Sequence, residues 1–217
     1  KLKKAQDAIT AMRPYSDKLT ELIQNLSSSI DGDTQNPYTE QRPVQNVLVL
    51  VITSNRGLCG GFNSNVVKAV SKNISTVYAN KKVSLITLGK KGNDILQKSF
   101  EIETNNNEIF DELTFSNASA IADSFMSDFT NKKYDKNEVV YNRFKNAATQ
   151  IVTTETLLPI VSEQDDQNTA GADYIFEPTQ ENIVQELLPK SIKTVSYTHL
   201  RAHETSLHLV CRLLLEK

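Results

Sequence analysis

A nearly unbroken apolar run rich in valine restricts the fold of this chain more than any other feature. The run is "VQNVLVLVIT", residues 44–53. A strand that is apolar on both faces must be covered on both, which is typical of a parallel sheet between layers of helices. A second run of this kind, "VSLITLG", occupies residues 83–89. The two runs predict neighbouring buried strands in an α/β domain.

Helical patterns alternate with the expected strands. The apolar spacing predicts helices after a cap at Asn63 or Ser64, over residues 93–98 and over residues 116–131. Further extended segments are expected at 100–103, 138–144 and 149–160. This alternation indicates an open, largely parallel α/β sheet over residues 44–161.

Two helices with apolar seams flank this domain. In residues 1–30 the apolar positions alternate steps of three and four, which is typical of a coiled coil and also compatible with an ordinary amphipathic helix. Residues 174–195 begin a second seam with Val184, Leu188, Ser191 and Val195, after an acidic linker at 162–173. The complementary faces favour an antiparallel coiled coil. Pro14 and Pro189 predict a bend in each helix, or an early break at Pro189.

Composition excludes several classes of protein. The 217 residues carry a formal net charge of −2, so we expect no nucleic-acid partner. No stretch approaches the roughly 20 apolar residues that cross a bilayer. Cys59 and Cys211 are far apart and belong to no CxxC pair, so neither a zinc site nor a disulfide framework is expected. These features predict a protein of the cytosol or of a cytosolic membrane face.

Residues 196–217 differ from the rest of the chain. They hold His199, His203 and His208, the only three histidines, together with Cys211. The histidines could form a metal cluster, but the segment resembles a translated sequencing-adapter tail. We therefore favour a non-native tail and assign these histidines no role.

The loop "VITSNRGLCGGFNSN", residues 51–65, resembles a phosphate-binding loop only superficially. A Walker-type loop needs Lys and then Ser or Thr after its last glycine, but Phe62 and Asn63 stand there. The glycine spacing also differs from that of a dinucleotide fingerprint. Cys59 could be a nucleophile, but no histidine precedes residue 199 to act as its base, so a small buried hydrophobe is favoured.

The segment "SNRGLCGGFNSNVVK", residues 54–68, resembles the signature loop of the gamma subunit of rotary F-type ATP synthases, with Asn55 where aspartate is common. The segments "KLKKAQDAITAMRPY" (1–15), "VVYNRFKNAATQ" (139–150) and "YIFEPTQENIVQELLP" (174–189) resemble the same family. The resemblance covers residues 1–195. Compared with the family pattern, the sequence lacks the start of the first helix and most of the last one.

The resemblance implies a central shaft, formed by the two terminal helices as an antiparallel coiled coil, above a Rossmann-like foot. It implies a rotor subunit with no active site and no cofactor, which transmits torque between a membrane ion-driven ring and the catalytic subunits. The implied partners are the alpha, beta and epsilon-type subunits and the c-ring. The implied location is peripheral, on the cytoplasmic face of a bacterial inner membrane.

The resemblance also suggests roles for single residues. Gly57, Gly60 and Gly61 would permit tight turns, and Arg56 would reach a carboxylate on the shaft or a beta subunit, unless it is simply solvated. Cys59 belongs to the same loop. Lys3 and Lys4 would face a beta subunit or water. Two other functions stay open: a Rossmann-type nucleotide-binding enzyme that uses the Gly57–Gly61 loop, and a coiled-coil interaction module unrelated to ATP synthesis.

Overall fold

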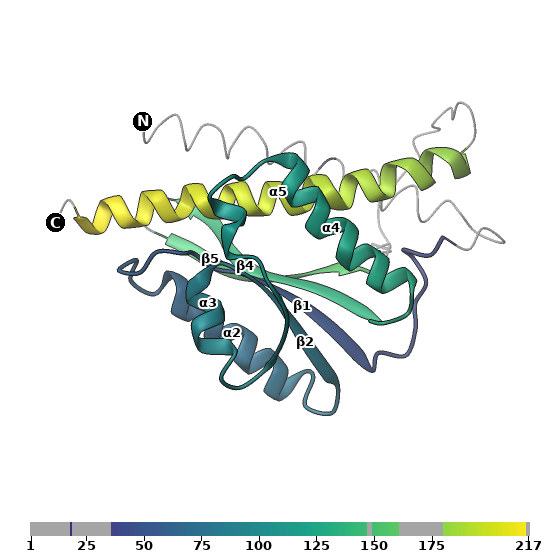
Figure 1. Cartoon of the computed structure of the whole chain (residues 1–217), viewed down its shortest axis with the longest axis horizontal. Helices are drawn as coiled ribbons and strands as arrows, with labels where there is room; N and C mark the ends of the chain where they lie inside the picture. Colours follow the sequence, from purple (N-terminus) through teal and green to yellow (C-terminus); the bar gives the residue numbers. More distant parts are fainter. Residues whose placement is uncertain (1–17, 19–35, 147–148, 161–179, 216–217) are drawn as a thin grey trace, which may run out of the picture.

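A five-stranded mixed sheet is the centre of the fold (Figure 1). The structure is a computed structural model that describes residues 18, 36–146, 149–160 and 180–215. The strands are β1 (Asn46–Ile52), β2 (Lys82–Leu88), β3 (Glu101–Asn105), β4 (Lys136–Asn146) and β5 (Thr149–Leu158). Their order is β3-β2-β1-β4-β5, with β5 antiparallel to β4 and the other pairs parallel.

Helices cover both faces of the sheet. They are α2 (Phe62–Thr76), α3 (Lys90–Leu96), the 3₁₀ helix η1 (Asn107–Phe110), α4 (Phe115–Thr130) and α5 (Gln180–Leu215). Figure 1 shows α4 and α5 over one face and α2 and α3 on the other. This arrangement confirms the predicted α/β class, while the sheet is mixed because the β4–β5 pair is antiparallel.

The strand β1 is buried on both faces, as its sequence predicts. Its residues 47–52 are each at most 3% exposed. Leu48, Leu50 and Ile52 join the core beneath α4 and α5, whereas the alternate valines join the core beneath α2. The period of two along a strand sends neighbouring side chains to opposite faces, so one apolar run supplies both cores.

Several predicted helix limits are wrong. Helix α2 begins at Phe62 after Gly61, with no side-chain cap, so neither Asn63 nor Ser64 caps it. Helix α3 begins at Lys90, three residues before the predicted start. Asn63 instead accepts from the Ser54 amide in the preceding loop, and Asn55 and Thr53, far earlier in the chain, accept from the first amides of α3.

Helix α5 continues through Pro189, so the predicted early break is wrong. Proline lacks the N–H that would bond to the preceding turn. Leu188 and Ile192 on either side of it are at most 5% exposed, and this burial stabilises the helix across the missing bond. The helix also continues past residue 195 without interruption.

Some predicted features lie outside the described residues. They are Pro14 and all but residue 18 of the seam at 1–30, the linker at 162–173, and residues 174–179 of the last domain. Whether the terminal helices form a coiled coil therefore stays a prediction. Within the described part of the chain, no helix has the length and apolar character needed to span a membrane.

Candidate functional site

The loop between β1 and α2 is the candidate functional site, because it contains most of the residues that the sequence singles out. It lies at the carboxyl end of β1, at the left of Figure 1. Arg56, Gly57, Gly60 and Gly61 are exposed, whereas Cys59 is only 3% exposed. Lys3 and Lys4, the other two candidates, lie outside the described residues.

The backbone of this loop is left-handed at two positions. Gly60 has φ 56° and Leu58 has φ 57°. Glycine adopts this conformation freely, while a leucine there costs about 1–2 kcal/mol. A Cβ at Gly57 would make only ordinary contact, 3.6 Å from a lysine side chain, and one at Gly61 would meet a flexible amide side chain. Of these three loop glycines, Gly60 is the one whose φ favours glycine.

Asn63 is the residue around which the loop folds. Its Oδ1 accepts from the Ser54 amide at 3.0 Å, and its Nδ2 donates to Ser54 Oγ, the Arg56 carbonyl and Cys59 Sγ, each at 3.1 Å. The side chain is 8% exposed. Ser54 Oγ also donates to the Arg56 carbonyl at 2.7 Å. These buried bonds hold the loop in one conformation.

The end of β1 also binds the start of α3. The amides of the first three helical residues, 90–92, donate in turn to Asn55 Oδ1 at 2.8 Å, the Ser54 carbonyl at 3.0 Å and Thr53 Oγ1 at 2.9 Å. Asn55 Nδ2 donates to the carbonyl of Asn107 in η1 at 2.8 Å. One asparagine therefore joins three segments of the chain.

Two further glycines, which the sequence pattern does not single out, shape this site. A Cβ at Gly89, whose φ is 106°, would lie 2.2 Å from the Thr53 carbonyl oxygen, and one at Gly92 would lie 2.7 Å from Thr53 Oγ1. They allow α3 to approach the end of β1. The available signal was their position directly after the second apolar strand.

The geometry does not favour a phosphate site in this loop. A phosphate cradle needs backbone amides that are free to face the ligand. Here the Ser54 amide binds Asn63 of α2, the Arg56 amide binds Ser54 Oγ, and the Phe62 amide binds the Cys59 carbonyl at 3.2 Å. In a sheet of this order, ligands of α/β folds bind at the carboxyl ends of β1 and β4, where the strand order reverses. Asn142 of β4 closes that point by donating to the Phe62 carbonyl at 2.7 Å.

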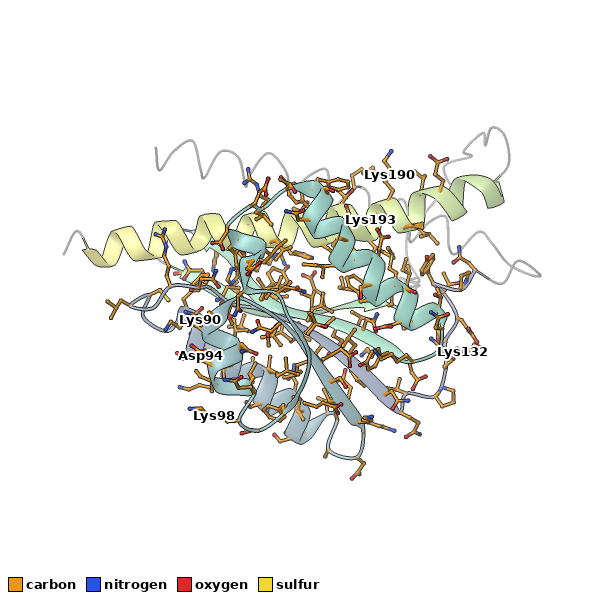
Figure 2. All side chains as sticks on the ribbon, viewed as in Figure 1. Lys90, Asp94, Lys98, Lys132, Lys190 and Lys193 are labelled. Atoms are coloured by element: carbon orange, nitrogen blue, oxygen red, sulfur yellow. The ribbon has the colours of Figure 1, made fainter. Side chains whose placement is uncertain are left out.

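Three cations border the loop. Arg56 is exposed, Lys90 is exposed on α3 beside the loop in Figure 2, and Lys91 contacts the loop near Gly57. None of the three forms an ion pair with another residue of the described ranges. Asp94, one turn further along α3, is the acidic group nearest to them in sequence on this helix.

A buried polar cluster lies where α2 ends. Tyr78 Oη donates to Glu138 Oε1 at 2.5 Å, and Lys136 Nζ lies 2.7 Å from the same oxygen. Burial, and then the hydrogen bond to Glu138, raise the pKa of Tyr78 to about 12. The phenol therefore stays protonated and the cluster is structural.

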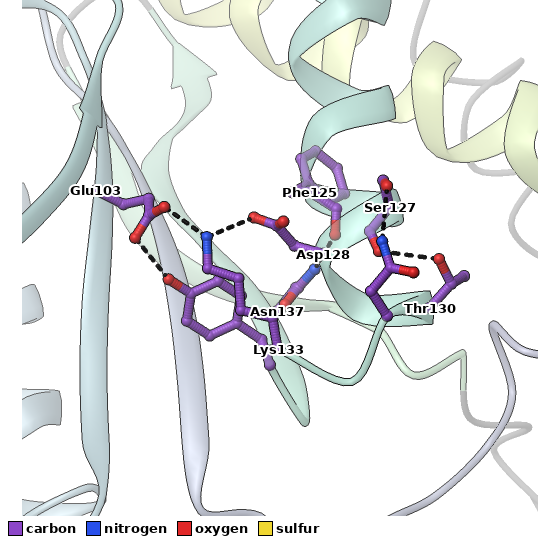
Figure 3. A network of polar contacts seen from close by, with 9 residues as sticks. Glu103, Phe125, Ser127, Asp128, Thr130, Lys133 and Asn137 are labelled. Atoms are coloured by element: carbon purple, nitrogen blue, oxygen red, sulfur yellow. Dashed lines mark hydrogen bonds and ion pairs between the residues drawn. The ribbon is translucent and has the colours of Figure 1, made fainter.

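A second polar cluster joins α4 to the edge strand β3 (Figure 3). Lys133 Nζ lies 2.5 Å from Glu103 Oε1 and 3.3 Å from an Asp128 oxygen, while Tyr134 Oη donates to Glu103 at 3.0 Å. The hydrogen bonds from Lys133 and Tyr134 lower the pKa of Glu103. Within the described residues, no group of three or more His, Cys, Asp and Glu could hold a metal ion.

Comparisons with known proteins agree on one family. The family model described as ATP synthase matches residues 1–210. The ATP synthase gamma chain of Flavobacterium johnsoniae is 53% identical over 208 residues, which are 96% of this chain and 72% of that protein. The gamma chain of Chlorobaculum tepidum is 36% identical, over 89% of this chain and 68% of that protein.

Solved structures share the fold. A chain from the central stalk and c-ring of the Tetrahymena thermophila mitochondrial ATP synthase has a TM-score of 0.64 at 20% identity, and the match covers 96% of this chain and 98% of that one. A chain of the Euglena gracilis mitochondrial ATP synthase rotor has a TM-score of 0.59 at 16% identity, covering 99% and 89%.

Proposed function

The chain belongs to the ATP synthase gamma-chain family, and from this premise we propose that it is a central-stalk rotor subunit of an F-type ATP synthase. In this role it transmits torque between the membrane ion-driven ring and the catalytic subunits during ATP synthesis or hydrolysis. The observation that carries the proposal is 53% identity to a bacterial gamma chain over 96% of this chain. The fold likeness to central-stalk chains supports it independently of that identity.

A rotor subunit performs no chemistry, and we propose that this chain has neither an active site nor a cofactor. Its partners are then the alpha, beta and epsilon-type subunits and the c-ring, and it is peripheral to a bacterial inner membrane on the cytoplasmic face. The nucleotide-binding alternative is not favoured, because the amides at Ser54, Arg56 and Phe62 already have partners.

The mixed sheet domain would be the Rossmann-like foot of the stalk, and α5 the start of the helix that enters the shaft. Torque can pass between these parts only if they share a stiff core. Leu188 and Ile192 of α5 are each at most 5% exposed, and Ile192 shares one core cluster with β1 and α4. This packing supports a foot that is continuous with its helix.

The loop candidates have structural or contact roles in this proposal. Arg56 would meet a carboxylate of a neighbouring subunit, and Lys3 and Lys4 would face a beta subunit. Gly57, Gly60 and Gly61 would let the loop turn, and Cys59 would fill space beneath it. The network around Asn63 keeps these residues in one arrangement.

A chimera tests the proposed function. Residues 1–195 of this chain would replace the matching part of the F. johnsoniae gamma chain, which keeps its own C-terminal helix, in a purified F1 assembly. We expect the chimera to co-purify with the alpha, beta and epsilon-type subunits and to support ATP hydrolysis. A chimera that folds but never enters the assembly would contradict the proposal.

Nucleotide titration provides the test of the alternative. Calorimetry of the full chain with ATP or NAD is expected to show no saturable binding in the micromolar range. Saturable binding that is lost with Gly60→Val would instead favour a nucleotide-binding enzyme.

A further inference from the structure

The side of the domain formed by α2 and α3 differs in charge from the rest of the chain. Residues 54–100 contain eight Lys or Arg and a single acidic residue, Asp94, so their net charge is +7 in a chain whose formal net charge is −2. Beyond the β1–α2 loop and the start of α3, the exposed cations of this side are Lys68, Lys72, Lys82 and Lys98. Figure 2 shows Lys90, Asp94 and Lys98 following α3 away from α5.

The positive charge of this side has no ion-pair partner in the described part of the chain. The ion pairs of the described residues include no cation from residues 54–100, and they do not include Asp94. On α2, Lys68 and Lys72 are four residues apart, so they are neighbours on the helix surface and repel each other. Folding gains nothing from these lysines, and their charge is available to an anionic surface.

Two exposed apolar residues lie among the lysines. Val77, directly after α2, is 65% exposed, and Ile95 of α3 is 49% exposed. Val77 follows Lys72 by five residues, and Ile95 precedes Lys98 by three. Lysines combined with exposed apolar side chains are typical of surfaces that lie in the headgroup layer of a membrane. We call the surface formed by the four exposed lysines, Val77 and Ile95 the α2–α3 face.

We propose that the α2–α3 face binds the headgroups of anionic phospholipids, with its lysines beside the phosphates and Val77 and Ile95 in the headgroup layer. The proposal rests on the proposed function, which brings the domain close to a membrane ring. It goes beyond that function, in which the chain is peripheral to the membrane only through its partner subunits.

A lipid surface fits the composition of the α2–α3 face better than a protein partner does. Protein interfaces are enriched in Arg and aromatic residues and depleted of Lys. The exposed cations of this face are all lysines, and its exposed apolar residues are both aliphatic. A lysine is a point charge on a flexible stem and needs no fixed acceptor geometry. Mobile headgroups meet this requirement.

The proposed contact is also compatible with rotation. Each lysine near an anionic membrane adds a weak attraction that fades within a Debye length. Such an attraction depends on the distance from the surface and has no preferred angle about the membrane normal. The contact would therefore hold the foot close to the membrane without fixing it at one rotational position.

Vesicle binding tests the proposal. The full chain would be titrated with vesicles of phosphatidylcholine alone and with vesicles of phosphatidylcholine and phosphatidylglycerol. We expect binding only to the second kind, and weaker binding as the salt concentration rises. Lys68→Glu with Lys72→Glu should weaken this binding about tenfold or more. The control is Lys145→Glu with Lys190→Glu, which makes the same change in charge at exposed positions of β4 and α5 and should have little effect.

A second pair of variants tests the apolar part of the face. Ile95→Ser should weaken binding to the anionic vesicles by about threefold or more, because less apolar surface then leaves water. Ile151→Ser is the matched control, since Ile151 is 47% exposed but lies on β5, and it should not change the binding. Lys68→Gln with Lys72→Gln separates charge from folding, because it keeps good helix formers and should weaken binding less than charge reversal does.

Each outcome supports or overturns the proposal. If only the variants of the α2–α3 face weaken binding, the proposal is supported. If the chain binds neither kind of vesicle, or if the Lys145 and Lys190 control weakens binding equally, the proposal is overturned. If the chain ignores vesicles and the Lys68 and Lys72 reversal instead keeps the chimera out of the F1 assembly, the face belongs to a protein partner. The proposed function fails separately, because its test is whether the unmodified chimera enters that assembly.

Discussion

Asn63 determines the loop conformation at the scale of one residue. Its amide group satisfies the buried Ser54 amide and binds the Arg56 carbonyl. Asn63→Ala leaves the buried Ser54 amide without its partner and should lower the free energy of unfolding by about 1–3 kcal/mol. Urea denaturation measures this change. Asn65→Ala, at an exposed position of the same helix, should change it by less than about 0.5 kcal/mol. Equal effects would show that Asn63 has no special role.

His203 provides the opposite case, a polar residue whose removal should stabilise the protein. Its side chain is fully buried against Phe62, with ring centroids 4.7 Å apart, and neither ring nitrogen has a partner among the residues that the structure describes. His203→Leu should therefore raise the free energy of unfolding by about 1–3 kcal/mol at pH 8. A loss of stability in urea would mean that the imidazole has a native partner in solution.

The pH dependence of this variant follows from the same burial. Desolvation lowers the pKa of His203 to about 3, whereas in the unfolded chain the pKa is near its ordinary value of 6.5. Between these values the unfolded chain binds the proton and the folded one does not, so wild type loses about 1.4 kcal/mol per pH unit as the pH falls. His203→Leu lacks this loss, so its advantage should grow from pH 7 to pH 5.

At the scale of secondary-structure elements, the ion pairs in Figure 3 join α4 to β3. Lys133→Met removes the ammonium that lies between Glu103 and Asp128, and it should cost about 0.5–1 kcal/mol because all three groups are partly solvated. Lys132→Met is the control, since its ion pair with Glu40 is 3.2 Å long and more exposed.

The pH dependence separates the ionic contribution of Glu103 from packing. Because Lys133 and Tyr134 lower the pKa of Glu103 in the folded protein, this contribution is present above the unfolded pKa, near 4.3, and is lost as the pH falls through the folded pKa. Chemical denaturation from pH 7 to pH 2.5 should therefore show the Lys133→Met and wild-type curves converging in acid. A constant difference would assign the effect to packing.

Elements whose burial follows from the local apolar pattern could be predicted from the sequence. Element limits that depend on contacts between residues far apart in the sequence could not. The strands β1 and β2 are within two residues of their predicted ends because their apolar runs must be buried. The start of α3 was missed because the groups that bind its first amides come from Asn55, Ser54 and Thr53, some 35 residues earlier. Likewise, the sequence marks Asn63 as a helix cap, whereas the fold turns its amide toward the preceding loop.

At the scale of the whole molecule, α5 packs into the core of the sheet domain and, in the proposed role, also begins the helix that enters the shaft. Leu188 is 1% exposed on this helix, and two residues later Lys190 is exposed at the surface in Figure 2. If torque enters the foot through α5, stiffness depends on the contacts of Leu188 and Ile192 rather than on the helix alone. The same contacts should therefore control both stability and mechanical coupling.

Leu188→Ala tests this dependence. Removing a buried leucine should lower the free energy of unfolding by about 2–5 kcal/mol in the full chain, whereas Lys190→Ala should have almost no effect. If the chimera is built into the complete complex, with its membrane ring in sealed vesicles, and the temperature keeps Leu188→Ala folded, we expect ion-driven ATP synthesis to decrease more than ATP hydrolysis, because a loosely packed core deforms under torque. If both activities decrease equally, the foot does not need this packing for coupling, and α5 only anchors the sheet domain.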